Sequence, residues 1–311
     1  MCCRRTATPL YEGEQMTSRR RDDEVLVVIG SGGMGLCIAR RVGAGRVIVL
    51  ADIDRACLDT AAEALSGEGH RVVTRDVDVT CRSSVGALAE LAERSGRVAA
   101  VVHTAGLSPQ QASAQAILAV DLLGVALVLD EFGAVIAPGG AGVVIASMAA
   151  HMYPALDSEL ERQLANTPTD ELLDLDVCTS ITDSRLAYPF AKRANQIRVA
   201  AAAAAWAERG ARINCISPGI ISTAMGRLEL SGESGTLMQA MVDKAGLRRI
   251  GTPDDIAAAT EFLLGPSAGF ITGTDLLVDG GVVAALHSGT VDLGIGGGSS
   301  VSPDLIEASK Q

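Results

Sequence analysis

Tyr188 and Lys192 lie four positions apart at the start of a long apolar stretch. Residues at this spacing share one face of a helix, so the phenol and the ammonium can reach the same small site. A free phenol ionises at about pH 10, and a neighbouring cation favours the phenolate and lowers that pKa. The pair is therefore a candidate acid–base unit, although a Tyr and a Lys on an exposed amphipathic helix would show the same spacing.

A glycine-rich turn follows the first strongly apolar stretch. Residues 24–29 predict a buried strand, and residues 30–35 (GSGGMG) have the G-x-G-x-x-G pattern ahead of a predicted helix. In this context glycines let a pyrophosphate approach backbone N–H groups at a helix N-terminus, where the dipole also favours negative charge. The expected dinucleotide contacts are Gly30, Gly32, Gly33, Met34 and Gly35.

Asp52 follows the second predicted strand, residues 46–51. An acidic residue about 20 positions beyond the first glycine is placed to accept a hydrogen bond from a ribose 2′-OH, and it would repel a 2′-phosphate. The alternative role, capping the predicted helix over residues 55–65, suits Asp54 better. The sequence therefore predicts NAD rather than NADP.

Strands and helices alternate along the rest of the chain. Further strands are predicted over residues 71–77, 98–102, 143–146 and 212–216, with helices such as 83–94 between them. This alternation predicts an α/β fold with a doubly wound parallel sheet, in which ligands bind at the carboxyl ends of the strands. We expect a single domain over residues 24–286 between flexible tails, 1–23 and 287–311.

Composition excludes several classes of partner. The chain has 311 residues, 48% of them hydrophobic, which is enough for a large core, and a net charge of −11, which would repel nucleic acid. Its seven scattered cysteines lack a C-x-x-C motif, which argues against a disulfide framework and a metal site and favours a reducing, cytoplasmic location. The uncharged run over residues 132–156 is broken by Pro138, Gly139 and Gly140, so no membrane span is predicted.

These motifs together resemble the short-chain dehydrogenase/reductase (SDR) family over about residues 24–282, although the glycine loop is one residue shorter than the family's usual pattern. The resemblance implies a Rossmann fold with a seven-stranded sheet and hydride transfer between a secondary alcohol and a ketone. By this resemblance Tyr188 is the general acid or base, Lys192 lowers the pKa of the phenol and contacts the nicotinamide ribose, and Ser147 binds the substrate oxygen.

Further cofactor contacts follow from the same resemblance. The turn from His103 to Gly106 (HTAG) replaces the family's Asn-Asn-Ala-Gly, so only its backbone role is carried over. His103 is interpreted as a packed residue, with acid–base chemistry as the alternative. The implied contacts are Asp78 and Val79 beside the adenine, Ala105 and Gly106 in the turn, and Pro218, Gly219, Ile221 and Thr223 beside the nicotinamide.

Asp121 takes the place of an Asn that, in the family, supports a water chain to the catalytic Lys. An Asp at this position adds a negative charge. It could pair with Lys192 and perturb the proton relay, it could still hold the water, or it could be structural. We include Asp121 in the predicted catalytic set.

An acidic stretch at about residues 151–183 widens the separation of Ser147 and Tyr188 beyond that of most family members. Its leucines predict two short amphipathic helices, the second with Thr167 as N-cap and Pro168 at its first position. A comparable insertion occurs in a bacterial hydroxysteroid-dehydrogenase-like branch of the family. A lid, a subunit interface and a solvated surface excursion remain open.

The predicted function is NAD-dependent interconversion of a small apolar alcohol and a ketone. Met148, Ile220 and Met225 are the candidate substrate contacts, although apolar lining is usual for small-molecule pockets. The resemblance implies a homodimer or homotetramer through the helices that carry Asp121 and Tyr188. The alternatives are an NADP-linked 3-oxoacyl-thioester reductase and a dinucleotide-binding regulator without catalysis.

Overall fold

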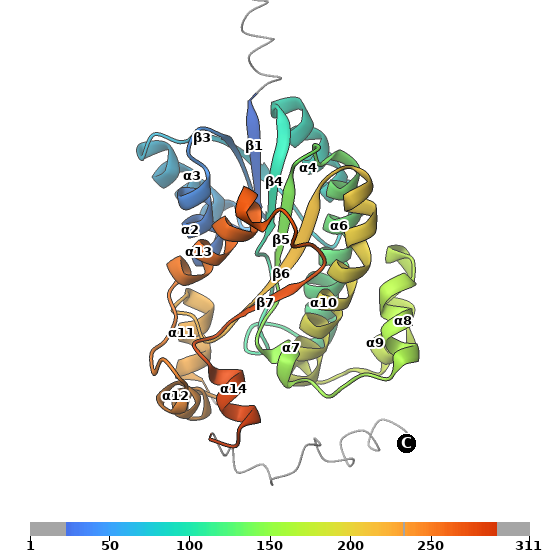
Figure 1. Ribbon diagram of the computed structural model, residues 1–311, viewed down its shortest axis with the longest axis vertical. Coiled ribbons are helices and arrows are strands. Elements are labelled where there is room, and N and C mark those ends of the chain that lie inside the picture. Colours follow the sequence, from blue (N-terminus) through green and yellow to red (C-terminus); the bar gives the residue numbers. More distant parts are fainter. Residues whose placement is uncertain (1–22, 233, 291–311) are drawn as a thin grey trace, which may run out of the picture.

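The computed structural model describes residues 23–232 and 234–290. Within these residues seven strands form one parallel sheet in the order β3-β2-β1-β4-β5-β6-β7 (Figure 1). The predicted α/β fold is confirmed. The strands are β1 (Glu24–Ile29), β2 (Val47–Asp52), β3 (Arg71–Asp76), β4 (Arg97–His103), β5 (Ala141–Ile145), β6 (Arg212–Pro218) and β7 (Asp275–Val278).

The central strands are apolar on both faces because helices cover both sides of the sheet. Val27 of β1 lies between Val49 of β2 and Val101 of β4 in the parallel register, and all three side chains are almost completely buried. The strand order reverses direction between β1 and β4, which creates the crevice where sheets of this type bind ligands.

Long helices cover both faces of the sheet (Figure 1). The helices α2 (Gly33–Val42), α3 (Arg55–Gly67) and α13 (Pro253–Leu264) bury their apolar sides in one core. The helices α4 (Arg82–Ser95), α6 (Gly124–Val135) and α10 (Ser184–Glu208) enclose the other core. There Trp206 of α10 is fully buried and donates from Nε1 to Leu129 O of α6 at 3.2 Å, which fixes the two helices side by side.

Shorter elements lie in the connections. The helix leading into α6 consists of α5 (Ala114–Ile117) and a π-helical segment, η1 (Leu118–Leu123), which carries Asp121. The others are α7 (Ala149–Met152), α11 (Ala224–Ser231), α12 (Gly235–Lys244), η3 (Pro266–Ala268) and α14 (Val282–His287).

The acidic insertion folds against the body of the domain. It forms α8 (Ser158–Asn166), a 3₁₀ helix η2 (Thr169–Asp174) and α9 (Asp176–Ser180). Leu164, Leu172 and Cys178 share an apolar cluster with Phe190 and Ala194 of α10. One side of the insertion is therefore packed on α10, while most of its residues stay partly or fully exposed.

The second predicted helix of the insertion is wrong in detail. Pro168 precedes η2 instead of opening an α-helix, and the extended backbone of Leu175 separates η2 from α9. The buried residues of η2 are Thr169 and Leu172, three positions apart, which is the repeat of a 3₁₀ helix.

Among the described residues, no helix is both long and apolar enough to cross a bilayer. The predicted tails fall mainly on residues 1–22 and 291–311, which lie outside the described part. Helix α14 extends to His287, where the sequence predicts that the C-terminal tail begins.

Candidate active site

The glycine loop makes a tight turn from β1 into α2. Gly30 has φ +99°, which favours glycine, and a Cβ on Gly35 would lie 1.8 Å from Gly30 O. Gly32 is the N-cap of α2 and provides no side-chain hydrogen bond. The first backbone N–H groups of α2, including those of Gly33 and Met34, thus have no side-chain cap and can donate hydrogen bonds to an anion.

The turn after β4 is tied to this loop. Thr104 N and Ala105 N both donate to Ile29 O, at 2.7 and 3.0 Å, and Thr104 Oγ1 donates to Gly30 O at 2.9 Å. The sequence reasoning gave Thr104 no role. The sequence held one signal for this role. Thr104 takes the place of the family's second Asn, where a polar side chain faces the glycine loop.

Asp52 lies at the carboxyl end of β2, as predicted, and already accepts hydrogen bonds from the protein. Its Oδ2 accepts from Ser31 N at 2.6 Å and from Ser31 Oγ at 2.8 Å, while Oδ1 accepts from Asp54 N at 3.0 Å. Asp54 caps α3, which leaves Asp52 at the edge of the crevice. Ile53 beside it is 72% exposed, an apolar surface that the sequence reasoning missed.

The predicted adenine-side pair, Asp78 and Val79, is engaged within the protein. Asp78 Oδ1 accepts from Thr80 N at 2.9 Å and from Thr80 Oγ1 at 2.7 Å. Val79 is buried against Gly124 of α6, because a Cβ on that glycine would lie 2.8 Å from Val79 Cγ2. Both residues follow β3 at the expected edge, and their contact with a cofactor stays a prediction.

The segment after β6 lies beside the glycine loop. Pro218 O accepts from Met148 N at 2.8 Å, and Gly219 N donates to Val278 O at 2.9 Å. A Cβ on Gly33 would lie 3.5 Å from Thr223 Cγ2. The predicted nicotinamide segment and the predicted pyrophosphate loop therefore face each other.

Tyr188 and Lys192 lie at the start of α10. Asp183 caps this helix by accepting from Arg185 N at 2.9 Å, and Pro189 lies inside the helix, in its second turn, where it removes one backbone donor. Lys192 Nζ lies 5.5 Å from the centroid of the Tyr188 ring. The predicted common face of the two side chains is present.

Ser147 follows β5 and meets this pair. The residue is 9% exposed, and its Oγ accepts from Ala149 N at 3.2 Å. The same hydroxyl acts on the Tyr188 phenol as a hydrogen-bond partner and favours the phenolate. Strand β5 and helix α10 thus bring together two residues that the acidic insertion separates in sequence.

Burial dominates the electrostatics of Tyr188. It raises the pKa of the phenol, while Lys192 and Ser147 lower that pKa and the charges of Asp121 and Glu229 raise it further. The net pKa is raised, so the expectation that Lys192 would bring it below its ordinary value is not met by the protein alone. Lys192 acts in the predicted direction, but it is outweighed.

Asp121 pairs with Lys192 below the site. Its Oδ2 lies 3.0 Å from Lys192 Nζ, its Oδ1 accepts from Leu107 N at 2.7 Å, and both charged side chains are buried. A Cβ on Gly106 would lie 3.2 Å from Asp121 Oδ2 and 3.2 Å from Lys192 Nζ. Burial lowers the pKa of Lys192, but Asp121 and Tyr188 outweigh it and raise the pKa, so Lys192 is a cation.

His103 lies near this pair and is uncharged. Burial and the charge of Lys192 lower the pKa of His103 to about 3. The imidazole is 1% exposed, and neither ring nitrogen has a hydrogen-bond partner within the described part of the chain. The position agrees with a packed residue.

The predicted substrate contacts differ in exposure. Met148 and Ile220 are 8% and 5% exposed and pack with side chains of α12 and α14. Met225 lies on α11 and is partly exposed. Met148 and Ile220 therefore pack with these helices, and their contact with a substrate stays a prediction.

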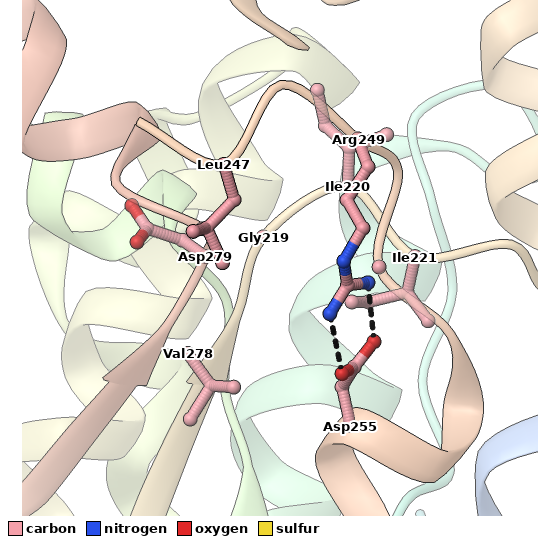
Figure 2. A pocket seen from close by; sticks show the side chains of 10 residues that line it. Gly219, Ile220, Ile221, Leu247, Arg249, Asp255, Val278 and Asp279 are labelled. Atoms are coloured by element: carbon pink, nitrogen blue, oxygen red, sulfur yellow. Dashed lines mark hydrogen bonds and ion pairs between the residues drawn. The ribbon is translucent and has the colours of Figure 1, made fainter. Parts of the chain in front are cut away.

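A separate hollow of about 90 Å³ lies where β6 and β7 end (Figure 2). Arg249 extends to Asp255 there and makes two charged hydrogen bonds, of 2.8 and 2.7 Å. Ile220 and Ile221 line the hollow, whereas Ser147, Tyr188 and Lys192 do not. The hollow thus shares Gly219, Ile220 and Ile221 with the predicted nicotinamide and substrate contacts, but it is separate from the three predicted catalytic side chains.

Comparison with known proteins gives consistent matches. The family model described as "Enoyl-(Acyl carrier protein) reductase" matches residues 28–157 and 173–283. The chain is 39% identical over 267 residues to "Short-chain dehydrogenase/reductase bsc3" of Alternaria brassicicola, covering 85% of this chain and 97% of the relative. It is 31% identical to "Galactitol 2-dehydrogenase (L-tagatose-forming)" of Cereibacter sphaeroides, covering 84% and 96%.

Solved structures agree with the fold. A "Short-chain dehydrogenase/reductase SDR:Glucose/ribitol dehydrogenase" from Brucella melitensis is 26% identical with a TM-score of 0.67, covering 85% of this chain and 98% of that one. A "blue fluorescent protein from metagenomic library in complex with NADPH" is 22% identical with a TM-score of 0.66, covering 84% and 98%, and shows the fold alone.

Proposed function

The chain belongs to the short-chain dehydrogenase/reductase family and is an oxidoreductase, and from this premise we propose that it interconverts a secondary alcohol and a ketone with NAD(H). The observation that supports the proposal is the convergence of Ser147, Tyr188 and Lys192 at the carboxyl edge of the sheet. Ser147 follows β5, and Tyr188 and Lys192 lie on α10, so two regular elements would position these groups around a reacting oxygen.

A bound nicotinamide supplies the hydride acceptor or donor, and the protein moves the proton. In oxidation, Tyr188 takes the proton of the substrate hydroxyl, and in reduction it returns a proton to the ketone oxygen. Ser147 orients that oxygen and stabilises charge on it. Lys192 favours the phenolate, and Asp121 positions Lys192 through their 3.0 Å ion pair.

The crevice fits a dinucleotide. The uncapped amides at the start of α2 suit a pyrophosphate, and Thr223 lies close to Gly33 on the opposite side. Asp52 keeps a carboxylate at the edge for a ribose hydroxyl, and the exposed side chain of Ile53 offers an apolar surface to the base. Among the described residues, no cation is paired with Asp52. Its carboxylate would therefore repel a 2′-phosphate. We therefore favour NAD over NADP.

The proposed substrate is a small secondary alcohol or its ketone. The names of relatives include a polyol dehydrogenase and "3-alpha-hydroxysteroid dehydrogenase/carbonyl reductase" of Comamonas testosteroni, which is 28% identical to this chain. A preference for NADP and an acyl thioester would instead support the thioester reductase that the sequence left as an alternative.

Replacing the phenol tests the proposal. We expect Tyr188→Phe to reduce alcohol oxidation at least about 10³-fold, because the proton acceptor is lost, while NAD binding changes less than about threefold. The matched control is Tyr153→Phe, since this half-buried tyrosine packs on Phe190 and has no role in the proposed chemistry. Absorbance of NADH over a panel of secondary alcohols gives the rate, and calorimetry gives the affinity for NAD.

Two outcomes would contradict the proposal. Undiminished turnover by Tyr188→Phe would remove Tyr188 from the mechanism. Tight binding of NAD without turnover of any alcohol or ketone by the wild type would support the dinucleotide-binding regulator.

A further inference from the structure

Glu229 brings a carboxylate toward the phenol of Tyr188. It lies on α11, which with α12 and α14 gathers beyond one end of the sheet (Figure 1). Glu229 is partly buried while its neighbour Leu228 is 47% exposed, so its side chain turns inward. Its negative charge contributes to the raised pKa of Tyr188. An acidic group therefore lies within electrostatic range of the Tyr188 phenol.

Ser108 faces the same carboxylate from the loop after β4. The residue is 1% exposed, and its hydroxyl has no close hydrogen-bond partner within the described residues. Burial raises the pKa of Glu229, and the Ser108 hydroxyl opposes this rise. A buried hydroxyl without a close partner is unfavourable unless a ligand or water completes its hydrogen bonds.

Contacts between the loops fix this arrangement. A Cβ on Gly232, at the end of α11, would lie 3.1 Å from Gln110 Nε2. Ser184 Oγ, at the start of α10, donates to Pro109 O at 3.3 Å. The loop that carries Ser108 thus lies against both α11, which carries Glu229, and α10, which carries Tyr188.

We propose that Ser108 and Glu229 bind a second hydroxyl group on the carbon next to the reacting one, so that the substrate is a vicinal diol or polyol. A carboxylate accepts from that hydroxyl, and the serine can donate to it or accept from it. A purely apolar neighbour would leave both groups unpaired, and a substrate anion would be repelled. The proposal deepens the proposed alcohol dehydrogenase activity and rests on it.

Matched alcohols test this selectivity. NAD-linked oxidation of butane-2,3-diol is compared with that of butan-2-ol, and oxidation of cyclohexane-1,2-diol with that of cyclohexanol. We expect wild-type kcat/KM to favour each diol about 10–100-fold, the range for a hydrogen bond to a charged group. Equal kcat/KM within each pair would overturn the diol proposal and leave the alcohol dehydrogenase function intact.

Variants assign the selectivity to the two side chains. Glu229→Ala should reduce the diol preference about 10-fold or more, Ser108→Ala less, and Glu229→Gln covers the case in which the alanine variant folds poorly. The control is Asp243→Ala, which removes an exposed carboxylate from neighbouring α12. An unchanged preference in Glu229→Gln and Glu229→Ala would overturn the assignment. If no alcohol in either pair is oxidised, and Tyr188→Phe equals the wild type, the proposed function fails and the diol proposal fails with it.

Discussion

The buried pair of Asp121 and Lys192 sets the charge below Tyr188. Because Asp121 is negative, it neutralises part of the field through which Lys192 favours the phenolate, and the pKa of Tyr188 is higher for it. The sequence allowed a pair, a held water or a structural role for Asp121. The 3.0 Å contact favours the pair.

Asp121→Asn should therefore move the pH profile. Oxidation requires the phenolate, so kcat/KM rises with pH through the pKa of Tyr188. Removing the negative charge lowers that pKa, and the rising part of the profile should shift to lower pH. The shift is measured on a secondary alcohol at saturating NAD, with Asp130→Asn as the control because that carboxylate pairs with Arg82 at the surface.

The opposite shift would contradict this argument and would mean that Asp121 acts mainly by keeping Lys192 charged. Thermal unfolding adds a second measurement. Breaking one side of a buried ion pair destabilises by about 3 kcal/mol, whereas the exposed control should change stability by less than about 1 kcal/mol.

The residues whose side chains carry the proposed chemistry could be predicted from the sequence. The residues that surround them could not. Tyr188 and Lys192 are recognisable because few residue types have ionisable side chains, and these two lie four positions apart. Glu229 influences Tyr188 and is influenced by Ser108, although the three residues lie on a loop and two helices that are distant in sequence. Such influences depend on how α11 packs, and no local pattern encodes that packing.

At the scale of elements, the junction of β1 and α2 determines cofactor binding. Gly35→Ala would place a methyl group 1.8 Å from Gly30 O, which the loop cannot accommodate without moving. We expect at least about 10-fold weaker NAD binding, measured by calorimetry. The matched control is Gly67→Ala at the end of α3, where a Cβ meets nothing within 4 Å and alanine should leave NAD binding unchanged. Equal affinities of the two variants would contradict this role of the loop.

Element types could be predicted better than their ends and their helical form. The apolar runs of the strands, such as residues 24–29, leave little choice of structure because both faces are buried. In the insertion, the positions of Thr169 and Leu172 in the sequence are compatible with a short amphipathic helix. The 3₁₀ form of η2 is selected by packing against η1 and α10, which sequence periodicity does not contain.

At the scale of the whole molecule, the insertion covers helices that the sequence predicted to meet a second subunit. Leu164, Leu172 and Cys178 pack over Leu118 of η1 and Phe190 of α10. A homodimer or homotetramer remains a prediction. Contact through these helices would have to include the insertion.

Arg198 anchors the insertion to α10. This arginine is 8% exposed and donates to Thr167 O at 2.8 Å, to Leu164 O at 3.3 Å and to Thr169 Oγ1 at 2.9 Å. Arg198→Met removes donors from buried acceptors, so it should lower the free energy of unfolding by about 2 kcal/mol and increase hydrogen exchange over residues 158–180.

The control for this variant is Arg162→Met, which removes the same charge from an exposed pair with Glu159 inside α8. Since exposed pairs contribute little, the control should change stability by less than about 0.5 kcal/mol and leave hydrogen exchange unaffected. If the two variants lose equal stability, Arg198 does not anchor the insertion. If Arg198→Met speeds exchange in the insertion without affecting turnover, the insertion folds on the helix face independently of the active site, and its role as a lid is excluded.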